Sequence, residues 1–339
     1  MFVTIQNFSS IYSEQPFMRE LHNLAAQKSS KNAEIRWLDC TRIAGTDCYC
    51  DDEAVKEINK LIDESLNFSC EAAPATPPAI HFFDNGNYHY MSKLWTDRIQ
   101  EPFDLVVFDH HPDMQPPRFG DILRCGGWVK KVLEENKFVQ NVILIGVADH
   151  LVEELQEDIA SLGDRASSLV IVKESELANI DDRRETKDER TASGLQTIDE
   201  SRKTIDDREK VDNRKLEVDS LNNGASRGID AESAKSHFIR LKPRTSNLYL
   251  SIDKDVLSPA DAATNWDQGS LTFEALKSII TELSQGKKIL GIDICGERAQ
   301  EFSAIENGAQ TAQEADELNN KLNQELVEFL RCEVGTSCL

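Results

Sequence analysis

Largely uncharged runs of Val, Ile, Leu and Phe recur along the chain, separated by segments in which apolar residues follow helical spacing. Uncharged runs of this kind are typical of strands that are buried on both faces of a sheet. Eight of them are strand candidates, at residues 1–5, 35–38, 79–83, 103–108, 141–145, 168–172, 247–252 and 289–294. Their alternation with helical patterns predicts an α/β protein with three layers, α/β/α, around a mostly parallel sheet of about eight strands.

Two helices have the clearest pattern. Residues 51–66 carry apolar side chains at helical spacing, and Asp51 and Asp52 suit the N-cap and the first turn. Near the C-terminus a leucine recurs at every fourth position, at Leu318, Leu322, Leu326 and Leu330. We expect this stripe to face the core, while contact between copies of the chain in a homo-oligomer remains open.

The segment from residue 181 to residue 235 breaks this pattern. It holds 15 acidic and 12 basic residues among 55, and it has no Phe, Tyr or Trp. Such a composition cannot offset the entropy of ordering the chain, so we expect a disordered or loosely helical insertion. A tolerated surface loop is favoured over a regulatory or partner-binding role. The remaining residues, 1–180 and 236–339, are expected to form a single domain.

The charge balance narrows the class of partner. The 339 residues include 38 basic and 60 acidic side chains, for a formal net charge of −22. An acidic surface disfavours nucleic acid and anionic membranes. No run approaches the roughly 18 consecutive apolar residues of a membrane span, and the N-terminus lacks the basic and apolar regions of a secretion signal. We therefore expect a cytoplasmic protein that acts on a small-molecule substrate.

Metal-ligating side chains follow two of the predicted strands. Asp109, His111 and Asp113 alternate directly after the run 103–108, and Asp253 and Asp255 follow the run 247–252. Alternate residues share one face of a strand, and the carboxyl ends of parallel strands meet at one edge of the sheet. Carboxylates and imidazole together suit a divalent cation. Four carboxylates exceed what one ion usually needs, so the pattern favours two metals.

A third strand adds a candidate ligand. His89 follows the run 79–83, and Gly86 allows a tight turn that brings it back over the sheet. A lone histidine is more often structural than a ligand, and a lone D-x-D is commonly a turn or a helix cap. The combination is much harder to obtain by chance. His110 points away from its neighbours along the strand, and we expect it to pack beside the site or support it.

The order of these motifs resembles the ureohydrolase family, the arginases and agmatinases: His89, then Asp109 to Asp113, then S-x-D-x-D-x-x-x-P from Ser251 to Pro259. The resemblance implies an arginase-like catalytic domain with two Mn²⁺ ions. One ion would be held by His89, Asp109, Asp113 and Asp253, and the other by Asp109, His111, Asp253 and Asp255. Asp109 and Asp253 would bridge the two.

Such a centre implies hydrolysis of a non-peptide C–N bond in a guanidino, amidino or amide group. A hydroxide that bridges the metals would be the nucleophile, and the same charges would stabilise the tetrahedral intermediate. Asp113 could hold that hydroxide by a hydrogen bond.

The substrate pocket departs from the family pattern. Cys125 stands near the place of a histidine that assists proton transfer in arginases, and Glu297 comes one residue later than the glutamate that binds guanidinium. The Pro-Gly that follows D-x-D in the family is replaced by residues 263–269. Cys125 is either an acid/base or substrate-binding thiol, or a small buried residue at a helix start. We expect Cys125 or Glu297 near the substrate, and Asp293 is a further candidate because it lies at the end of the same strand.

Two other functions stay open. A single-zinc deacetylase of the related fold needs only two aspartates and a histidine, and His89, Asp113 and Asp255 argue against it because they complete a second site. A non-catalytic metal-binding protein is the other alternative.

The eight cysteines are expected to be mostly reduced. Cys40, Cys48 and Cys50 could hold zinc or form a redox pair, but no C-x-x-C pair or fourth ligand supports zinc.

Overall fold

The structure is a computed structural model that describes residues 2–27, 35–67, 79–117, 120–177, 243–300 and 311–334. The charged segment 181–235 lies outside these residues. Eight parallel strands form one sheet in the order β2-β1-β4-β10-β9-β5-β7-β8. Their bounds are β1 Phe2–Asn7, β2 Ile35–Asp39, β4 Ala79–Phe82, β5 Phe103–Phe108, β7 Val139–Val147, β8 Leu169–Lys173, β9 Asn247–Asp253 and β10 Lys288–Cys295. All eight predicted strands are confirmed.

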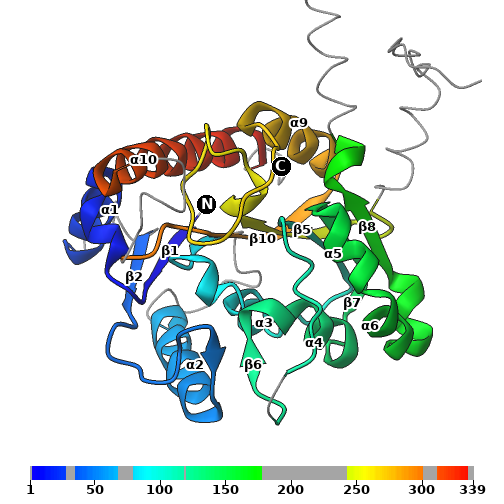
Figure 1. The fold of residues 1–339 in the computed structure, drawn as a ribbon. Coiled ribbons are helices and arrows are strands. Elements are labelled where there is room, and N and C mark those ends of the chain that lie inside the picture. Colours follow the sequence, from blue (N-terminus) through cyan, green and yellow to red (C-terminus); the bar gives the residue numbers. More distant parts are fainter. Residues whose placement is uncertain are drawn as a thin grey trace, which may run out of the picture.

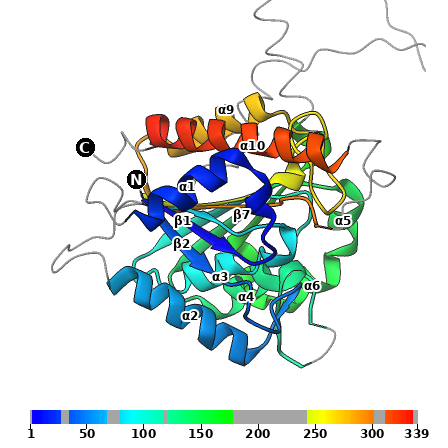
Figure 2. The same ribbon diagram turned by 90° about the vertical axis from the view of Figure 1, so that its left-hand side faces the viewer.

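Helices cover both faces of this sheet, which confirms the three-layer fold (Figures 1 and 2). One face carries α1 Pro16–Ala26, α9 Phe273–Ser284 and α10 Ala312–Phe329. The other carries α2 Asp52–Asn67, α3 Met91–Thr96 and α4 Trp128–Glu135. Two short helices, α5 Asp149–Glu154 and α6 Gln156–Ser161, lie near β8. The core is correspondingly divided into two apolar clusters, one on each side of the strands.

The two helices that the sequence predicts best are present. Asp51 accepts hydrogen bonds from the backbone of Glu53 and Ala54 at 3.0 and 2.9 Å, which caps α2 as expected. In α10 the later leucines of the stripe, Leu322 and Leu326, are buried against the sheet. A capping box between Thr311 and Glu314 begins that helix. No helix in the part of the chain that the structure describes is both long and apolar enough to span a membrane.

The sequence pattern did not indicate a small second sheet. β3 Tyr49–Cys50 and β6 Leu123–Arg124 pair antiparallel, with Tyr49 opposite Arg124 and Cys50 opposite Leu123. Two-residue strands are too short for period-2 alternation to register. This ladder fixes the loop after β5 beside the segment after β2.

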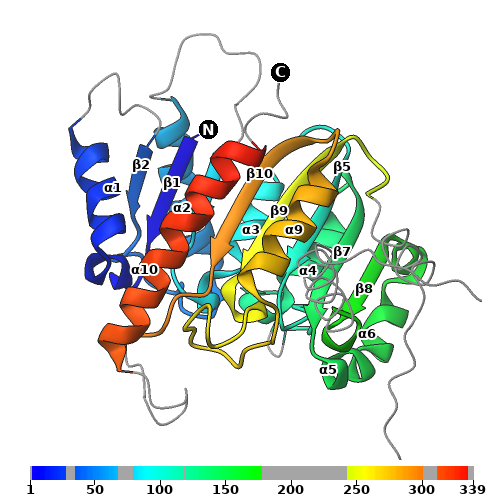
Figure 3. The same cartoon turned by 90° about the horizontal axis from the view of Figure 1, so that it is seen from above.

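Seen from above, α9 and α10 lie over β9 and β10, and the strands all end at the same edge of the sheet (Figure 3). The four central strands are β4, β10, β9 and β5. The segments that follow them therefore meet at the middle of that edge, where open α/β sheets bind their ligands.

Candidate metal centre

The segments after the central strands converge as the sequence predicts. Asp253 is the last residue of β9, and Asp109 directly follows β5. His89 ends a 3₁₀ turn, Gly86–Tyr88, whose start is capped by the Asn85 side chain. A Cβ atom on Gly86 would lie 2.7 Å from the Trp266 ring and 3.2 Å from the Asp253 carboxylate. Glycine is therefore required at position 86 because a side chain would collide with these two groups. The φ of Gly86 is not in the left-handed region that the predicted tight turn would use.

His89 is the centre of a first group of ligand atoms. Its Nδ1 lies 3.1 Å from Asp109 Oδ2, 3.1 Å from Asp113 Oδ2 and 3.4 Å from Asp253 Oδ2. Its Nε2 forms a 2.9 Å hydrogen bond with Ser251 Oγ, which fixes the ring orientation. All three carboxylates and the imidazole are buried.

His111 is the centre of a second group. Its Nδ1 lies 2.9 Å from Asp255 Oδ2 and 3.6 Å from Asp109 Oδ1. Its Nε2 lies 3.1 Å from Asp267 Oδ1, so this carboxylate holds the far side of the ring. The two oxygens of Asp109 are therefore divided between the two histidines, Oδ2 toward His89 and Oδ1 toward His111.

The crowded carboxylates perturb one another. Burial and the neighbouring Asp255 raise the pKa of Asp253 to about 7, and burial and Asp109 raise the pKa of Asp255. Burial opposes a charge on His89, yet Cys295 and the carboxylates of Asp109 and Asp113 hold the pKa of His89 well above its usual value. Buried like charges at this density call for a compensating cation.

The donor set fits a divalent metal. His89 Nδ1 is buried and makes no hydrogen bond of acceptable geometry, although three carboxylate oxygens lie within 3.4 Å. A buried polar atom without a partner is costly, and a nitrogen aimed between oxygens is placed to share a cation with them. Ligand atoms of His89, Asp109 and Asp113 lie within 4.8 Å of one another, as do those of Asp109, His111 and Asp255.

Asp113 has a strained backbone and a fixed carboxylate. Its φ of 49° is in the left-handed region, which is uncommon for a residue other than glycine. Trp128 Nε1 donates a 2.7 Å hydrogen bond to Asp113 Oδ2, the oxygen that also faces His89. Backbone strain that is held in place by such a contact commonly marks a functional position.

A cavity of about 90 Å³ opens onto both groups. Asp109, His111, Asp113, Asp253 and Asp255 line it, together with Arg124 of β6, Cys125 and Trp266. Of the predicted ligands only His89, which is 1% exposed, is not part of the lining.

Cys125 reaches this cavity but its thiol is already engaged. Cys125 directly follows β6 and Cys48 directly precedes β3, and the backbone N–H of Cys125 donates to Cys48 O at 2.9 Å. The hydrogen bond to Cys48, together with burial, raises the pKa of the Cys125 thiol, and the same bond lowers the pKa of Cys48. Cys48 thus contacts Cys125 rather than Cys50, and among the described residues no metal-ligand group includes Cys40, Cys48 or Cys50.

Glu297 and Asp293 do not reach the cavity. Glu297 is wholly buried and accepts hydrogen bonds from the side chains of Lys254, Gln15, Asn319 and Asn323. Gly296, with φ 90°, turns the chain after β10 and directs Glu297 toward α10. Asp293 Oδ1 accepts a 2.7 Å hydrogen bond from Tyr249 and lies 2.8 Å from His81 Nδ1, beneath the sheet edge.

Several residues of the site were missed from the sequence. Asp267 and Trp266 lie in the loop that replaces the family's Pro-Gly, and Trp128 begins α4. No local signal marks them. Ser251 and Cys295 could have been found, because Ser251 shares the face of Asp253 by period-2 alternation and Cys295 ends a central strand.

Comparisons with known proteins agree with this geometry. A family model described as the arginase family matches residues 87–297. An uncharacterised protein of Thermotoga maritima is 22% identical over 295 residues, which cover 87% of this chain and 79% of the relative.

Two solved structures share the fold. The agmatine ureohydrolase of Thermoplasma volcanium aligns with a TM-score of 0.52 at 12% identity, covering 100% of this chain and 92% of that one. The proclavaminate amidino hydrolase from Streptomyces clavuligerus aligns with a TM-score of 0.51 at 13% identity, covering 95% and 90% of the two chains.

Proposed function

Because the chain belongs to the arginase family, we propose that it is a metal-dependent hydrolase that cleaves a non-peptide C–N bond of a small molecule. The bond would belong to a guanidino, amidino or amide group. The agmatine and amidino hydrolases that share its fold support this reaction type.

The division of the Asp109 carboxylate carries the proposal. Asp109 Oδ2 lies 3.1 Å from Nδ1 of His89, in the group that also contains Asp113. Asp109 Oδ1 lies 3.6 Å from Nδ1 of His111, in the other group. A carboxylate that serves two separate ligand groups is what two adjacent cations need as a bridge. We therefore propose two divalent ions, Mn²⁺ by family resemblance. His89, Asp109, Asp113 and Asp253 would hold one, and Asp109, His111, Asp253 and Asp255 the other.

Such ions, when bound, supply the positive charge that ionises water at neutral pH and stabilises a tetrahedral intermediate. The protein's own groups position the reactants. Asp113, fixed by Trp128, faces the cavity and can accept a proton from the attacking water. Asp267 holds the His111 ring through its far nitrogen. Cys125 keeps its proton because its hydrogen bond to Cys48 and burial raise its pKa, so it is better suited to contact the substrate than to transfer a proton.

Arg124 supports a substrate that carries an anionic group. It is the one Lys or Arg among the residues that line the described cavity. Gln115 Oε1 accepts a 2.7 Å hydrogen bond from its guanidinium, and a Cβ on Gly126 would lie 3.0 Å from the same nitrogen. The absence of a side chain at Gly126 thus leaves room for this conformation. We propose that the carboxylate floor receives the cationic end of the substrate and that Arg124 pairs with a carboxylate at its other end.

We also propose that residues 1–180 and 236–339 form one catalytic domain, with residues 181–235 as an insertion. The strands that precede and follow the insertion, β8 and β9, belong to the same sheet, which supports this division.

The test combines metal content with turnover. The protein is loaded with Mn²⁺, its metals are counted by elemental analysis, and hydrolysis is assayed with arginine, agmatine, guanidinobutyrate, formiminoglutamate and acetylated amines. We expect two ions per chain and turnover of at least one substrate, with loss of both in Asp253→Asn and retention in Asp121→Asn, an exposed carboxylate in the neighbouring loop.

Other outcomes would favour the alternatives. A single zinc with activity on acetylated amines would support the deacetylase. Two ions without turnover of any substrate would support a non-catalytic metal-binding protein. Activity that survives Asp253→Asn would refute the mechanism.

A further inference from the structure

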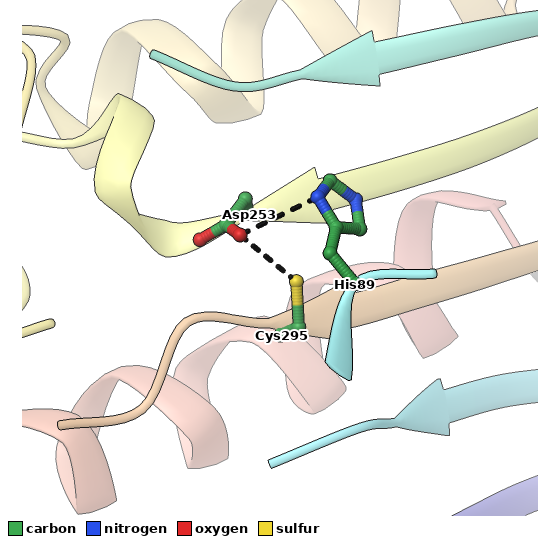
Figure 4. A group of neighbouring side chains, drawn as sticks. All are labelled: His89, Asp253 and Cys295. Carbon is green, nitrogen blue, oxygen red and sulfur yellow. Dashed lines mark hydrogen bonds and ion pairs between the residues drawn. The ribbon is translucent and has the colours of Figure 1, made fainter. Parts of the chain in front are cut away.

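A thiol at the end of β10 lies against the first ligand group. Cys295 is 1% exposed, and its Sγ donates a 3.1 Å hydrogen bond to Asp253 Oδ2. The same oxygen lies 3.4 Å from His89 Nδ1. Figure 4 shows this oxygen between the sulfur and the imidazole. Ligand atoms of the three residues all lie within 4.8 Å of one another, as close as those of the two carboxylate groups described above.

The sheet itself determines the position of this thiol. Parallel pairing of β10 with β9 sets Cys295 directly beside Asp253. The next residue is Gly296, where a Cβ would lie 2.3 Å from Asp253 Oδ1. The backbone therefore passes so close to the carboxylate that the Cys295 side chain has little freedom to turn away. Residues on strands hold metal ligands more rigidly than residues on loops.

The unpartnered nitrogen of His89 is independent support. His89 is 1% exposed, and its Nδ1 makes no hydrogen bond of acceptable geometry. Ser251 fixes the ring through Nε2, so Nδ1 is aimed at the space between the carboxylates and the thiol. An imidazole that is fixed by a partner on one nitrogen and left free on the other is the usual arrangement of a metal ligand.

We infer that Cys295 is a ligand of the ion held by His89 and Asp253, an inference that rests on the metal centre of the proposed function. On binding, the thiol loses its proton to solvent, its hydrogen bond to Asp253 Oδ2 breaks, and the sulfur lone pair is donated to the metal. A thiolate is a soft ligand, which Zn²⁺, Fe²⁺ and Co²⁺ accept more readily than Mn²⁺. This site should therefore prefer those metals, whereas the site of His111 and Asp255, built from oxygen and nitrogen ligands alone, should not.

Cobalt reports thiolate ligation directly. Metal-stripped full-length protein is titrated with Co²⁺ while near-ultraviolet absorption is recorded for wild type, Cys295→Ser and Cys125→Ser. Cys125 is the matched control because it is a second buried thiol, it lines the cavity beside the candidate ligands, and it belongs to none of the ligand groups. We expect a sulfur-to-cobalt charge-transfer band in wild type and Cys125→Ser. In Cys295→Ser the band should vanish, and the affinity for Zn²⁺ relative to Mn²⁺ should fall by at least about tenfold.

Two results would overturn the inference: a charge-transfer band that persists in Cys295→Ser, or cobalt binding to wild type without the band. If Cys295→Ser does not fold, X-ray absorption of wild type loaded with one Zn²⁺ decides, since a Zn–S distance of about 2.3 Å differs from Zn–N and Zn–O distances of about 2.0–2.2 Å. Absence of the sulfur shell would refute ligation. Sulfur ligation without turnover would instead retain Cys295 as a ligand and remove the hydrolase proposal.

Discussion

Glu297→Gln should destabilise the fold by about 3–5 kcal/mol, because it leaves a buried ammonium group without its counter-charge. Lys254 and Glu297 are both 0% exposed, and Lys254 Nζ donates to Glu297 Oε1. The same oxygen accepts from Asn323 at 2.7 Å, and Oε2 accepts from Gln15 at 2.7 Å and Asn319 at 2.9 Å. Glutamine retains one accepting oxygen, so its NH₂ group would face two donors.

Two further variants divide this loss of stability between the lost hydrogen bonds and the unpaired charge. Each neutral hydrogen bond that is lost contributes about 1 kcal/mol, and the rest comes from the unpaired charge of Lys254. Replacing both members, in Lys254→Met with Glu297→Gln, removes that charge, so the double variant should be less destabilised than the sum of the single variants. Glu274→Gln is the matched surface control. Its carboxylate pairs with Lys277 but is 82% exposed, so its loss should cost less than about 1 kcal/mol.

The assay is urea denaturation at a saturating metal concentration, followed by far-ultraviolet circular dichroism. Turnover of the best substrate is measured in parallel. The reasoning predicts lower stability for Glu297→Gln, with kcat changed little in the fraction that remains folded. If stability instead stays within about 0.5 kcal/mol of wild type while kcat collapses, Glu297 contacts the substrate and our account of this residue is wrong.

Three further predictions concern the surroundings of the site. Asp267→Ala should weaken metal binding by about tenfold because it frees the His111 ring, and unchanged affinity in a Co²⁺ titration would contradict this. Arg124→Gln should raise KM for arginine by roughly tenfold but leave KM for agmatine, which lacks the carboxylate, nearly unchanged; equal effects on both would exclude anion pairing. Burial raises the pKa of Asp84 to about 6, despite hydrogen bonds from Ser9 that lower it. The folded state then keeps a proton that the unfolded state loses, so the stability of wild type relative to Asp84→Asn should fall by about 1 kcal/mol as pH rises from about 5 to 6 in urea titrations, and a constant difference would refute the assignment.

The fold could be predicted because a strand that is buried on both faces is recognisable from its own sequence. A strand such as β5, Phe103–Phe108, is wholly buried and therefore almost free of charge, and this property shows in six consecutive residues. The one charged residue within it, Asp104, accepts a 2.6 Å hydrogen bond from the Asn141 side chain. No local sequence pattern predicts this contact. The strands β3 and β6 are too short to show such a pattern.

The convergence of the proposed metal ligands could be predicted for a similar reason. Asp109, His111 and Asp113 directly follow a central strand, and the carboxyl ends of parallel strands meet at one edge of the sheet. The strand period itself ends at Phe108, since the backbone of Asp113 is left-handed with φ 49°. The supporting residues depend on tertiary contacts instead. Asp267 reaches His111 across 156 positions of sequence, and Trp128 reaches Asp113 from the start of a helix. Spacing along the chain contains no information about either contact.

The position of Glu297 outside the cavity follows from Lys254, the residue between the two aspartates of D-x-D. A 3₁₀ turn, Lys254–Val256, follows β9. In this turn Asp255 Oδ2 faces His111, whereas Lys254 extends into the protein, where it is wholly buried. A buried ammonium group requires a carboxylate, and Glu297 supplies it.

Because Glu297 pairs with the buried Lys254, its side chain does not line the cavity. The residue of β10 that contacts the proposed metal ligands is then Cys295, two positions earlier in the sequence. Beside the candidate ligands, the cavity is lined by Arg124, at the end of β6, and by Trp266. The buried Lys254 thus accounts for the position of Glu297 outside the cavity.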